Sequence, residues 1–165
     1  LVLKQDRWKF IEDMSYSKAL IPFPSYGFNM TFKHPQHGIL SPLYEAVAVP
    51  LMNAAIEKAN ISFREIAFNR AFLQVPLELK FQKKHNGIHV DLPDPHYACV
   101  YYMNDADGDT IIYDQTFQDT PFGSTQVKVT EHKRVTPKKG RMVLFDGTRY
   151  QRNIHSCWNS MDSAQ

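Results

Sequence analysis

A histidine and an aspartate stand two residues apart in the stretch "GIHVDLPDPHYACVYYMNDADGDTIIYD" (87–114). Side chains alternate across a β-strand, so His89 and Asp91 would share one face of a strand over about 88–92. An imidazole and a carboxylate on one face can bind the same cation. A third ligand from a neighbouring strand would complete the 2-His-1-carboxylate face of non-haem Fe(II) sites. The alternative is a His and an Asp at a strand end that are solvated or hydrogen-bonded locally.

A series of short strands is expected to hold this pair. Apolar runs bounded by turns rich in Asp, Gly and Pro predict strands at about 88–92, 97–104, 109–114, 125–131 and 141–146. A run over 62–79 alternates enough for one or two further strands. A helix followed by many short strands is typical of a β-sandwich or jelly roll.

Residues 1–60 are expected to be helical or irregular support for that core. Residues 1–40 mix aromatics, prolines and glycines, which suggests irregular structure with a strand or two. Residues 41–60 form the clearest helix, since Ser41 can cap it and Pro42 suits its first position. Pro50 lies inside this helix and should kink or split it. The fold class we expect is therefore mainly β with N-terminal helices.

Length and composition limit the function classes. The 165 residues suit a single domain over 1–165, and 43% hydrophobic residues are enough for a core. A net charge of +2 does not predict a nucleic-acid partner, and no apolar run approaches a membrane span. Cys99 and Cys157 lack CxxC spacing and fit a reducing cytoplasm, although a disulfide stays open. We expect neither a nucleic-acid nor a membrane partner.

From about Ile61 onward, the ordered motifs resemble the 2-oxoglutarate- and Fe(II)-dependent dioxygenases. The closest likeness is to the prolyl 4-hydroxylase-like branch and to its small marine and phage members. The likeness is carried by "HVD" (89–91), "VYYMNDADGDT" (100–110), "VTPKKGRMVLFDG" (135–147) and a late histidine, His155. The ordered set is fairly specific, although no one motif is.

The resemblance implies a double-stranded β-helix, that is, a jelly roll, with Fe(II) held by His89, Asp91 and His155. It also implies 2-oxoglutarate as co-substrate, with ascorbate as a candidate reductant for the iron. The implied reaction hydroxylates an aliphatic C–H bond of a small-molecule or peptidyl substrate, with a peptidyl proline among the candidates, and releases succinate and CO2. Family likeness alone does not fix that substrate.

Two site assignments stay open in the sequence. The family places its distal histidine directly after a Tyr, and Gln151 follows Tyr150 here; we favour His155 as the ligand, with loss of the ligand as the alternative. The cation for the distal carboxylate of 2-oxoglutarate is expected just past Gln165, in a chain truncated at its C-terminus. Within the chain, Tyr101, Tyr102 and Arg149 are the co-substrate candidates, Arg149 being a weak one.

Two rival functions follow from these open points. The first is a catalytically inactive member of the same family, with Gln151 at the ligand position. The second is an unrelated jelly-roll binding module, in which the spacing of His89 and Asp91 is a coincidence.

Overall fold

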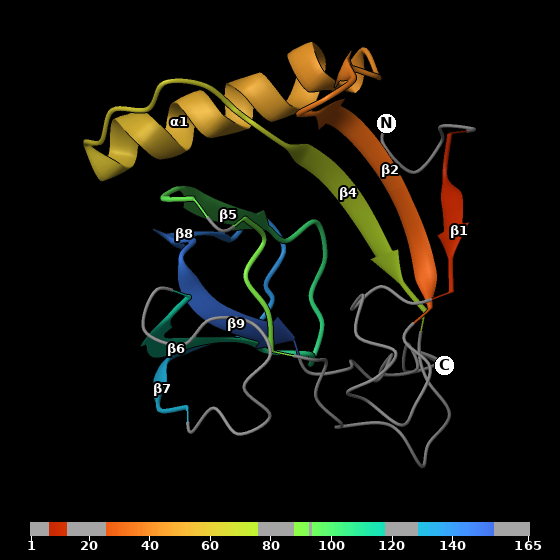
Figure 1. Cartoon of the computed structure of the whole chain (residues 1–165). Coiled ribbons are helices and arrows are strands. Elements are labelled where there is room, and N and C mark those ends of the chain that lie inside the picture. The colour runs from red at the N-terminus through yellow and green to blue at the C-terminus, as the bar shows by residue number, and fades with distance from the viewer. Residues whose placement is uncertain (1–6, 13–25, 76–87, 93, 118–128, 154–165) are drawn as a thin grey trace, which may run out of the picture. The chain divides into compact units, whose positions relative to one another are not determined.

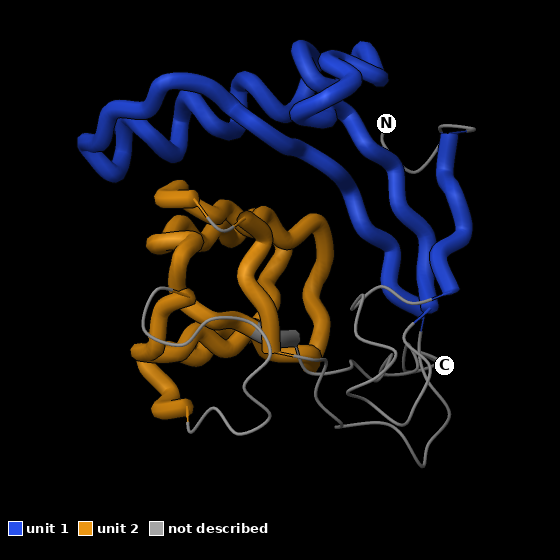
Figure 2. The backbone as a smooth tube through the Cα atoms, viewed as in Figure 1, with its two compact units in different colours: residues 1–14, 26–75 blue, residues 15–25, 76–165 orange. Residues whose placement is uncertain are grey.

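The computed structural model describes residues 7–12, 26–75, 88–92, 94–117 and 129–153. The chain divides into two compact units (Figure 2): unit 1 is Leu1–Met14 with Tyr26–Val75, and unit 2 is Ser15–Ser25 with Pro76–Gln165. The single domain over 1–165 therefore stays a prediction. Strands make up most of the regular structure, which confirms the mainly β class.

Unit 1 is a sheet with one helical segment (Figure 1). Its elements are β1 (Lys9–Ile11), β2 (Gly27–His34), β3 (Gly38–Ile39), the π-helical turn η2 (Tyr44–Ala48), α1 (Val49–Ala59) and β4 (Asn69–Gln74). The central strand β2 pairs antiparallel with β1, β3 and β4. Apolar residues of β2 and of the helical segment form the core: Met30, Phe32, Leu43, Tyr44 and Ala48.

The helical segment follows the predicted range with one irregularity. Ser41 Oγ accepts a hydrogen bond from the Leu43 amide at 3.3 Å, but the N-cap is Leu43 rather than the predicted Ser41, and Pro42 precedes the first helical residue, Tyr44. The hydrogen-bonding pattern then changes from π-helical to α-helical at Ala48/Val49, directly before Pro50. Proline lacks the amide hydrogen that a continuous helix needs, which accounts for a change at this point. Asn60 ends the helix in the left-handed conformation, with φ 51° and ψ 47°.

Unit 2 holds the shorter strands, which form two sheets. They are β5 (Tyr97–Tyr101), β6 (Thr110–Thr116), β7 (Glu131–Val135), β8 (Met142–Asp146) and β9 (Arg149–Asn153). One sheet is the pair β5–β8 and the other has the order β7-β6-β9. In Figure 1 the β5–β8 pair lies over the other sheet.

The antiparallel pairs of unit 2 are nested in the sequence. The innermost pair is β6–β7, the next is β5–β8, and the outermost is the bridge between His89 and Gln151. Strand β9 also pairs with β6, which joins the outer and inner pairs into one sheet. This nesting brings residues from both ends of unit 2 together.

Two predicted strands differ from the structure. The stretch 88–92 forms only an isolated bridge at His89, since Pro93 and Pro95 follow and cannot donate to a ladder. The predicted strand 125–131 lies partly outside the described residues, and the strand found here is β7 at Glu131–Val135. Its first four residues are exposed, because β7 lies at the edge of its sheet, and exposed edge strands favour charged over β-branched residues.

The helical content is smaller than expected. The described part of residues 1–60 contains one helical segment and three strands rather than several helices. No helix among the described residues has the length and apolar character needed to cross a membrane.

Candidate functional site

His89 and Gln151 are bound to each other through their backbones. The His89 amide donates to the Gln151 carbonyl at 3.0 Å, and the Gln151 amide donates to the His89 carbonyl at 2.9 Å. Residues opposite each other in an antiparallel bridge present their side chains on the same face. The residue that shares a face with His89 is therefore Gln151.

The side chain of Gln151 extends this arrangement to Asp91. Its amide nitrogen donates a hydrogen bond to Asp91 Oδ2 at 2.8 Å. Gln151 is 6% exposed, whereas Asp91 is an exposed residue, so the contact is buried on the glutamine side only. The structure thus brings His89, Asp91 and Gln151 together. Gln151 lies opposite His89 and contacts Asp91, as would be expected if His89 and Asp91 shared a face.

The same row continues across the sheet. Ile112 of β6 lies opposite Gln151 on one side and opposite Lys133 of β7 on the other. The row is therefore Lys133, Ile112, Gln151, His89, with all side chains on one face. At a strand spacing of about 4.8 Å, Lys133 stands three spacings from His89 at the level of the backbone.

The opposite face of this sheet carries a buried apolar cluster. Val90, Ile111, Tyr113 and Tyr150 form a buried cluster, with Ile111 fully shielded at 0% exposure. Burial raises the pKa of the Tyr150 phenol. Because these residues alternate in the sequence with His89, Ile112 and Gln151, packing on one face fixes the direction of the polar side chains on the other.

The three side chains fit a metal in part. His89 and Asp91 offer an imidazole and a carboxylate, the ligand types of a non-haem iron site. The third position carries an amide, which is neutral and a weaker donor than an imidazole. Within the described residues, no three His, Cys, Asp or Glu side chains gather closely enough to hold a metal ion.

The preferred third ligand, His155, lies outside the described residues. Up to Asn153, β9 pairs in regular register with β6, with Gln151 opposite Ile112 and Asn153 opposite Thr110. A strand advances about 3.3 Å per residue, so His155 would stand about 13 Å beyond Gln151 if the strand continued. The role of His155 as a ligand therefore stays a prediction. The position opposite His89, where a third ligand would be expected, is taken by Gln151.

The three co-substrate candidates lie in different surroundings. Tyr101 is 40% exposed, whereas the Tyr102 hydroxyl donates to Thr110 Oγ1 at 2.7 Å. Burial raises the pKa of Tyr102, and the hydrogen bond to Thr110 partly offsets this. The Arg149 guanidinium lies 3.5 Å from the Asp114 carboxylate, and its Nη1 donates to the Asp114 carbonyl at 3.2 Å. The binding roles of these residues stay predictions.

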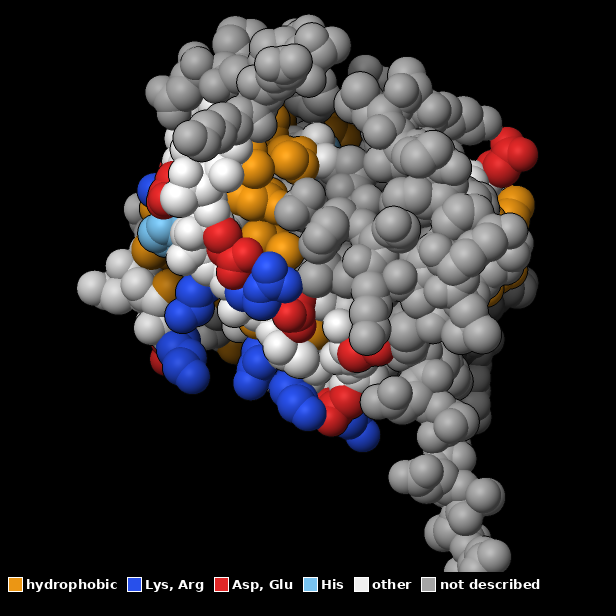
Figure 3. All heavy atoms as spheres, turned by 90° about the horizontal axis from the view of Figure 1, so that it is seen from below, with side chains coloured by type: hydrophobic (Ala, Val, Ile, Leu, Met, Phe, Trp, Pro, Cys, Tyr) orange, Lys and Arg blue, Asp and Glu red, His pale blue; other side chains and the backbone are white. Residues whose placement is uncertain are grey.

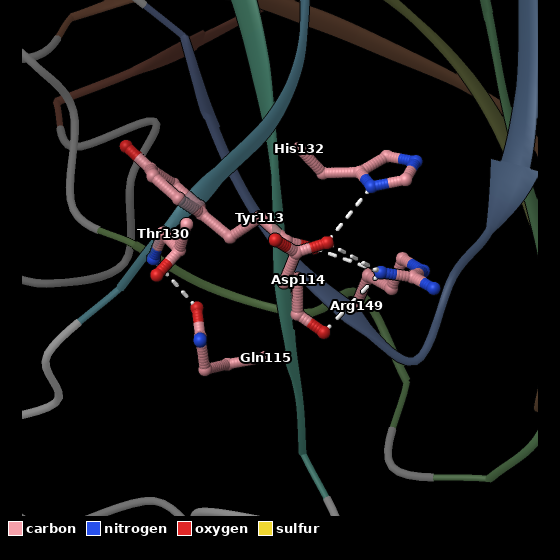
Figure 4. Close-up of polar contacts among 6 residues, drawn as sticks. All are labelled: Tyr113, Asp114, Gln115, Thr130, His132 and Arg149. Carbon is pink, nitrogen blue, oxygen red and sulfur yellow. Dashed lines mark hydrogen bonds and ion pairs between the residues drawn. The ribbon is translucent and has the colours of Figure 1, made fainter.

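Two features of unit 2 were not found from the sequence. The first is a polar cluster at the irregular centre of β6 (Figure 4), where Asp114 Oδ1 lies 2.8 Å from His132 Nδ1 and also faces Arg149. The register shifts on both sides of β6 near Tyr113, and this irregularity turns Asp114 toward both neighbours. The mixed charges of "EHKR" (131–134) were the available signal, but they do not reveal pairing with Asp114.

The second feature is the close packing of His96 on the turn at Gly147. The Gly147 amide donates to the His96 carbonyl at 2.8 Å, and a Cβ atom at position 147 would overlap the His96 ring. The glycine in "FDG" was visible in the sequence, but its partner was not. This contact fixes the turn between β8 and β9, two residues before Arg149.

Comparison of the chain with models of protein families, with curated proteins and with solved structures finds no match.

Proposed function

We propose that unit 2 is the jelly-roll core of an Fe(II)- and 2-oxoglutarate-dependent dioxygenase that hydroxylates an aliphatic C–H bond. The observation that carries the proposal is the nested strand pairing, which brings His89 and Asp91 against residue 151. The family resemblance places two metal ligands at His89 and Asp91, and position 151, directly after Tyr150, is where the family usually carries the third. The resemblance and the pairing are independent, because the motifs are local and the pairing is long-range.

The jelly-roll assignment is supported by the order of the pairs. A jelly roll arises when a long antiparallel ribbon rolls up, which pairs the first strand with the last and each inner strand with its counterpart. The pairs of the His89 bridge, β5–β8 and β6–β7 follow that order. The rolled ribbon would place the row containing His89 and Gln151 on the inner face.

In this proposal, His89 and Asp91 would hold the iron, with a third ligand from His155 or from the amide oxygen of Gln151. Iron held there would supply the activation of O2 that couples hydroxylation of a C–H bond to the conversion of 2-oxoglutarate into succinate and CO2, with one oxygen atom of O2 in each product. Gln151 orients the Asp91 carboxylate through its amide nitrogen. The buried apolar cluster behind the sheet keeps this polar row in register.

The second candidate function is the same fold without turnover. The specific observation in its favour is the hydrogen bond from Gln151 to Asp91, which satisfies that carboxylate without a metal. Such a protein would bind a ligand or a partner through the jelly roll. The unrelated binding module is a third reading, and under it His89 and Asp91 would have no metal affinity.

The test is the visible charge-transfer band that forms when 2-oxoglutarate chelates Fe(II) in the absence of oxygen. The variants are His89→Ala, Gln151→Ala, His155→Ala and Gln151→His, each compared with the parent by circular dichroism to confirm folding. We expect a band in the parent that is lost in His89→Ala. Loss in His155→Ala identifies the preferred third ligand, whereas loss in Gln151→Ala identifies the amide.

Two further outcomes separate the rivals. No band in the parent but a band in Gln151→His would establish an inactive site on an intact iron-binding frame. No band in any folded variant would contradict the dioxygenase proposal and leave the binding module. The substrate, for which a peptidyl proline is one candidate, can be sought by mass spectrometry once a band is seen.

A further inference from the structure

We infer that a groove in unit 2 binds a free carboxylic acid with an apolar chain. The groove has a volume of about 380 Å³, within the range of small-molecule sites. Its walls come from both sheets, with Ile112 and Val135 on one side and Val143 and Phe145 on the other. An apolar chain between these walls would be removed from water, which stabilises binding.

Basic side chains also line the groove. Lys133, His132 and Arg149 line it together with Asp146. Arg149 and His132 are held by Asp114, at 3.5 Å and 2.8 Å, so their positions are set before a ligand arrives (Figure 4). A carboxylate that enters here would meet donors that are already oriented.

Of the three basic residues in the lining, His132 and Arg149 are paired with Asp114, whereas Lys133 has no ion pair within the described part of the chain. Figure 3 shows Lys and Arg side chains gathered on one face with acidic ones among them. Arg134 pairs with Glu131 at 2.7 Å and Lys138 with Asp105 at 3.3 Å. Among the described residues, Lys133 has no such ion pair, so its charge is available to a ligand.

The one acidic side chain in the lining is already engaged. Asp146 Oδ1 accepts hydrogen bonds from the Thr148 amide at 3.0 Å and from the Thr148 hydroxyl at 2.7 Å. Both bonds hold this carboxylate in the turn before β9, and they reduce its repulsion of a bound anion. A monoanion with an apolar body therefore matches the groove better than a cation or a neutral polar molecule.

The groove also bears on the substrate of the proposed reaction, and in this respect the inference rests on the proposed function. Lys133 and Ile112 stand in the same row as Gln151 and His89. An acid held by Lys133 would extend its chain along the face that carries the proposed iron ligands. The substrate class inferred is an aliphatic carboxylic acid.

The test measures binding to the metal-free protein, so it does not depend on the iron site. Hexanoate is titrated against methyl-labelled protein, and the signals of Ile112, Val135 and Val143 are followed by NMR, with 1-hexanol as the uncharged probe. We expect saturable shifts with hexanoate and at least about fivefold weaker binding of hexanol, since the alcohol lacks the charge-assisted contact.

Matched variants decide which cation is responsible. Lys133→Gln should weaken hexanoate binding about fivefold or more, while Lys139→Gln, an exposed lysine outside the lining, should leave it unchanged. Val143→Phe should block the groove and abolish the shifts. The inference is overturned if hexanoate gives no saturable shift, if hexanol binds equally well, or if Lys133→Gln has no effect in a protein that folds like the parent. A missing charge-transfer band with intact hexanoate binding would contradict the proposed function alone.

Discussion

On one face of the β7-β6-β9 sheet, Val90, Ile111 and Tyr150 are buried against each other; on the other, His89, Gln151 and Lys133 stand in one row. Both faces come from the same strands, because successive residues point in opposite directions. The face with Ile111 carries the buried cluster that holds the register, although Ile112 on the other face is also buried, at 3% exposure. The polar face receives the side chains that could bind a ligand. Substitutions on the two faces should therefore separate stability from chemistry.

The largest expected effect is on the apolar face. Ile111→Ala removes a fully buried side chain and should lower the free energy of unfolding by about 2–4 kcal/mol. Urea denaturation followed by circular dichroism measures this, with Ile39→Ala as the control at a side chain that is 54% exposed. A loss below about 1 kcal/mol would contradict the comparison, because packing on this face would then contribute little to the stability of the sheet.

The turn that leads into the polar row should be the next most sensitive. Gly147→Ala forces a Cβ atom into the His96 ring and should cost about 1–3 kcal/mol of unfolding free energy. Adding His96→Ala removes the overlapping ring, so the double variant should recover part of the loss. Equal stabilities of the single and double variants would show that the overlap is not the cause.

A smaller effect is expected on the polar face itself. Gln151→Leu keeps the size of the side chain but removes the donor to Asp91, and should cost about 1 kcal/mol. A double-mutant cycle with Asp91→Ala isolates the contact, and a coupling energy of about 0.5–1.5 kcal/mol is expected. A coupling energy near zero would mean that the hydrogen bond does not contribute to folding.

A pH-dependent effect extends the comparison to the other sheet of unit 2. Burial raises the pKa of the Cys99 thiol on β5 from 9.0 to about 11. The folded state therefore holds this proton at pH values where the unfolded state loses it, and stability should decline as the pH rises from about 9 to 11. Denaturation midpoints across this range measure the decline, and Cys99→Ala should flatten it. An identical pH profile in the variant would contradict the assignment.

Local patterns in the sequence predicted much of unit 2. The strands expected at about 97–104, 109–114 and 141–146 correspond to β5, β6 and β8, because their apolar runs end at turns with Asp, Gly or Pro. These features depend on neighbouring residues only, so the sequence carries them directly. The shared face of His89 and Asp91, which was inferred from strand alternation, stays a prediction because 88–92 forms only an isolated bridge.

Long-range pairing could not be predicted in the same way. The run over 62–79 was expected to belong to the core that begins near Ile61, but β4 pairs with β2 in unit 1. The sequence identified position 151 as the place where the family usually carries its third ligand. It did not predict the hydrogen bond from Gln151 to Asp91, because that bond joins two segments 60 residues apart. The contact between His96 and Gly147 has the same origin. Which strands pair with each other depends on the packing of whole sheets. A short window of the sequence does not contain that information.

The separation of Asp91 and Gln151 in the chain also has a consequence for folding kinetics. Joining segments 60 residues apart closes a long loop, and its entropic cost must be met before the contact stabilises anything. Contacts of this kind slow folding and form only with most of the surrounding sheet in place. The outermost bridge, at His89, should therefore be among the last contacts to form and among the first to open. A ligand that binds this row would slow unfolding of unit 2 in proportion to its affinity for the closed state.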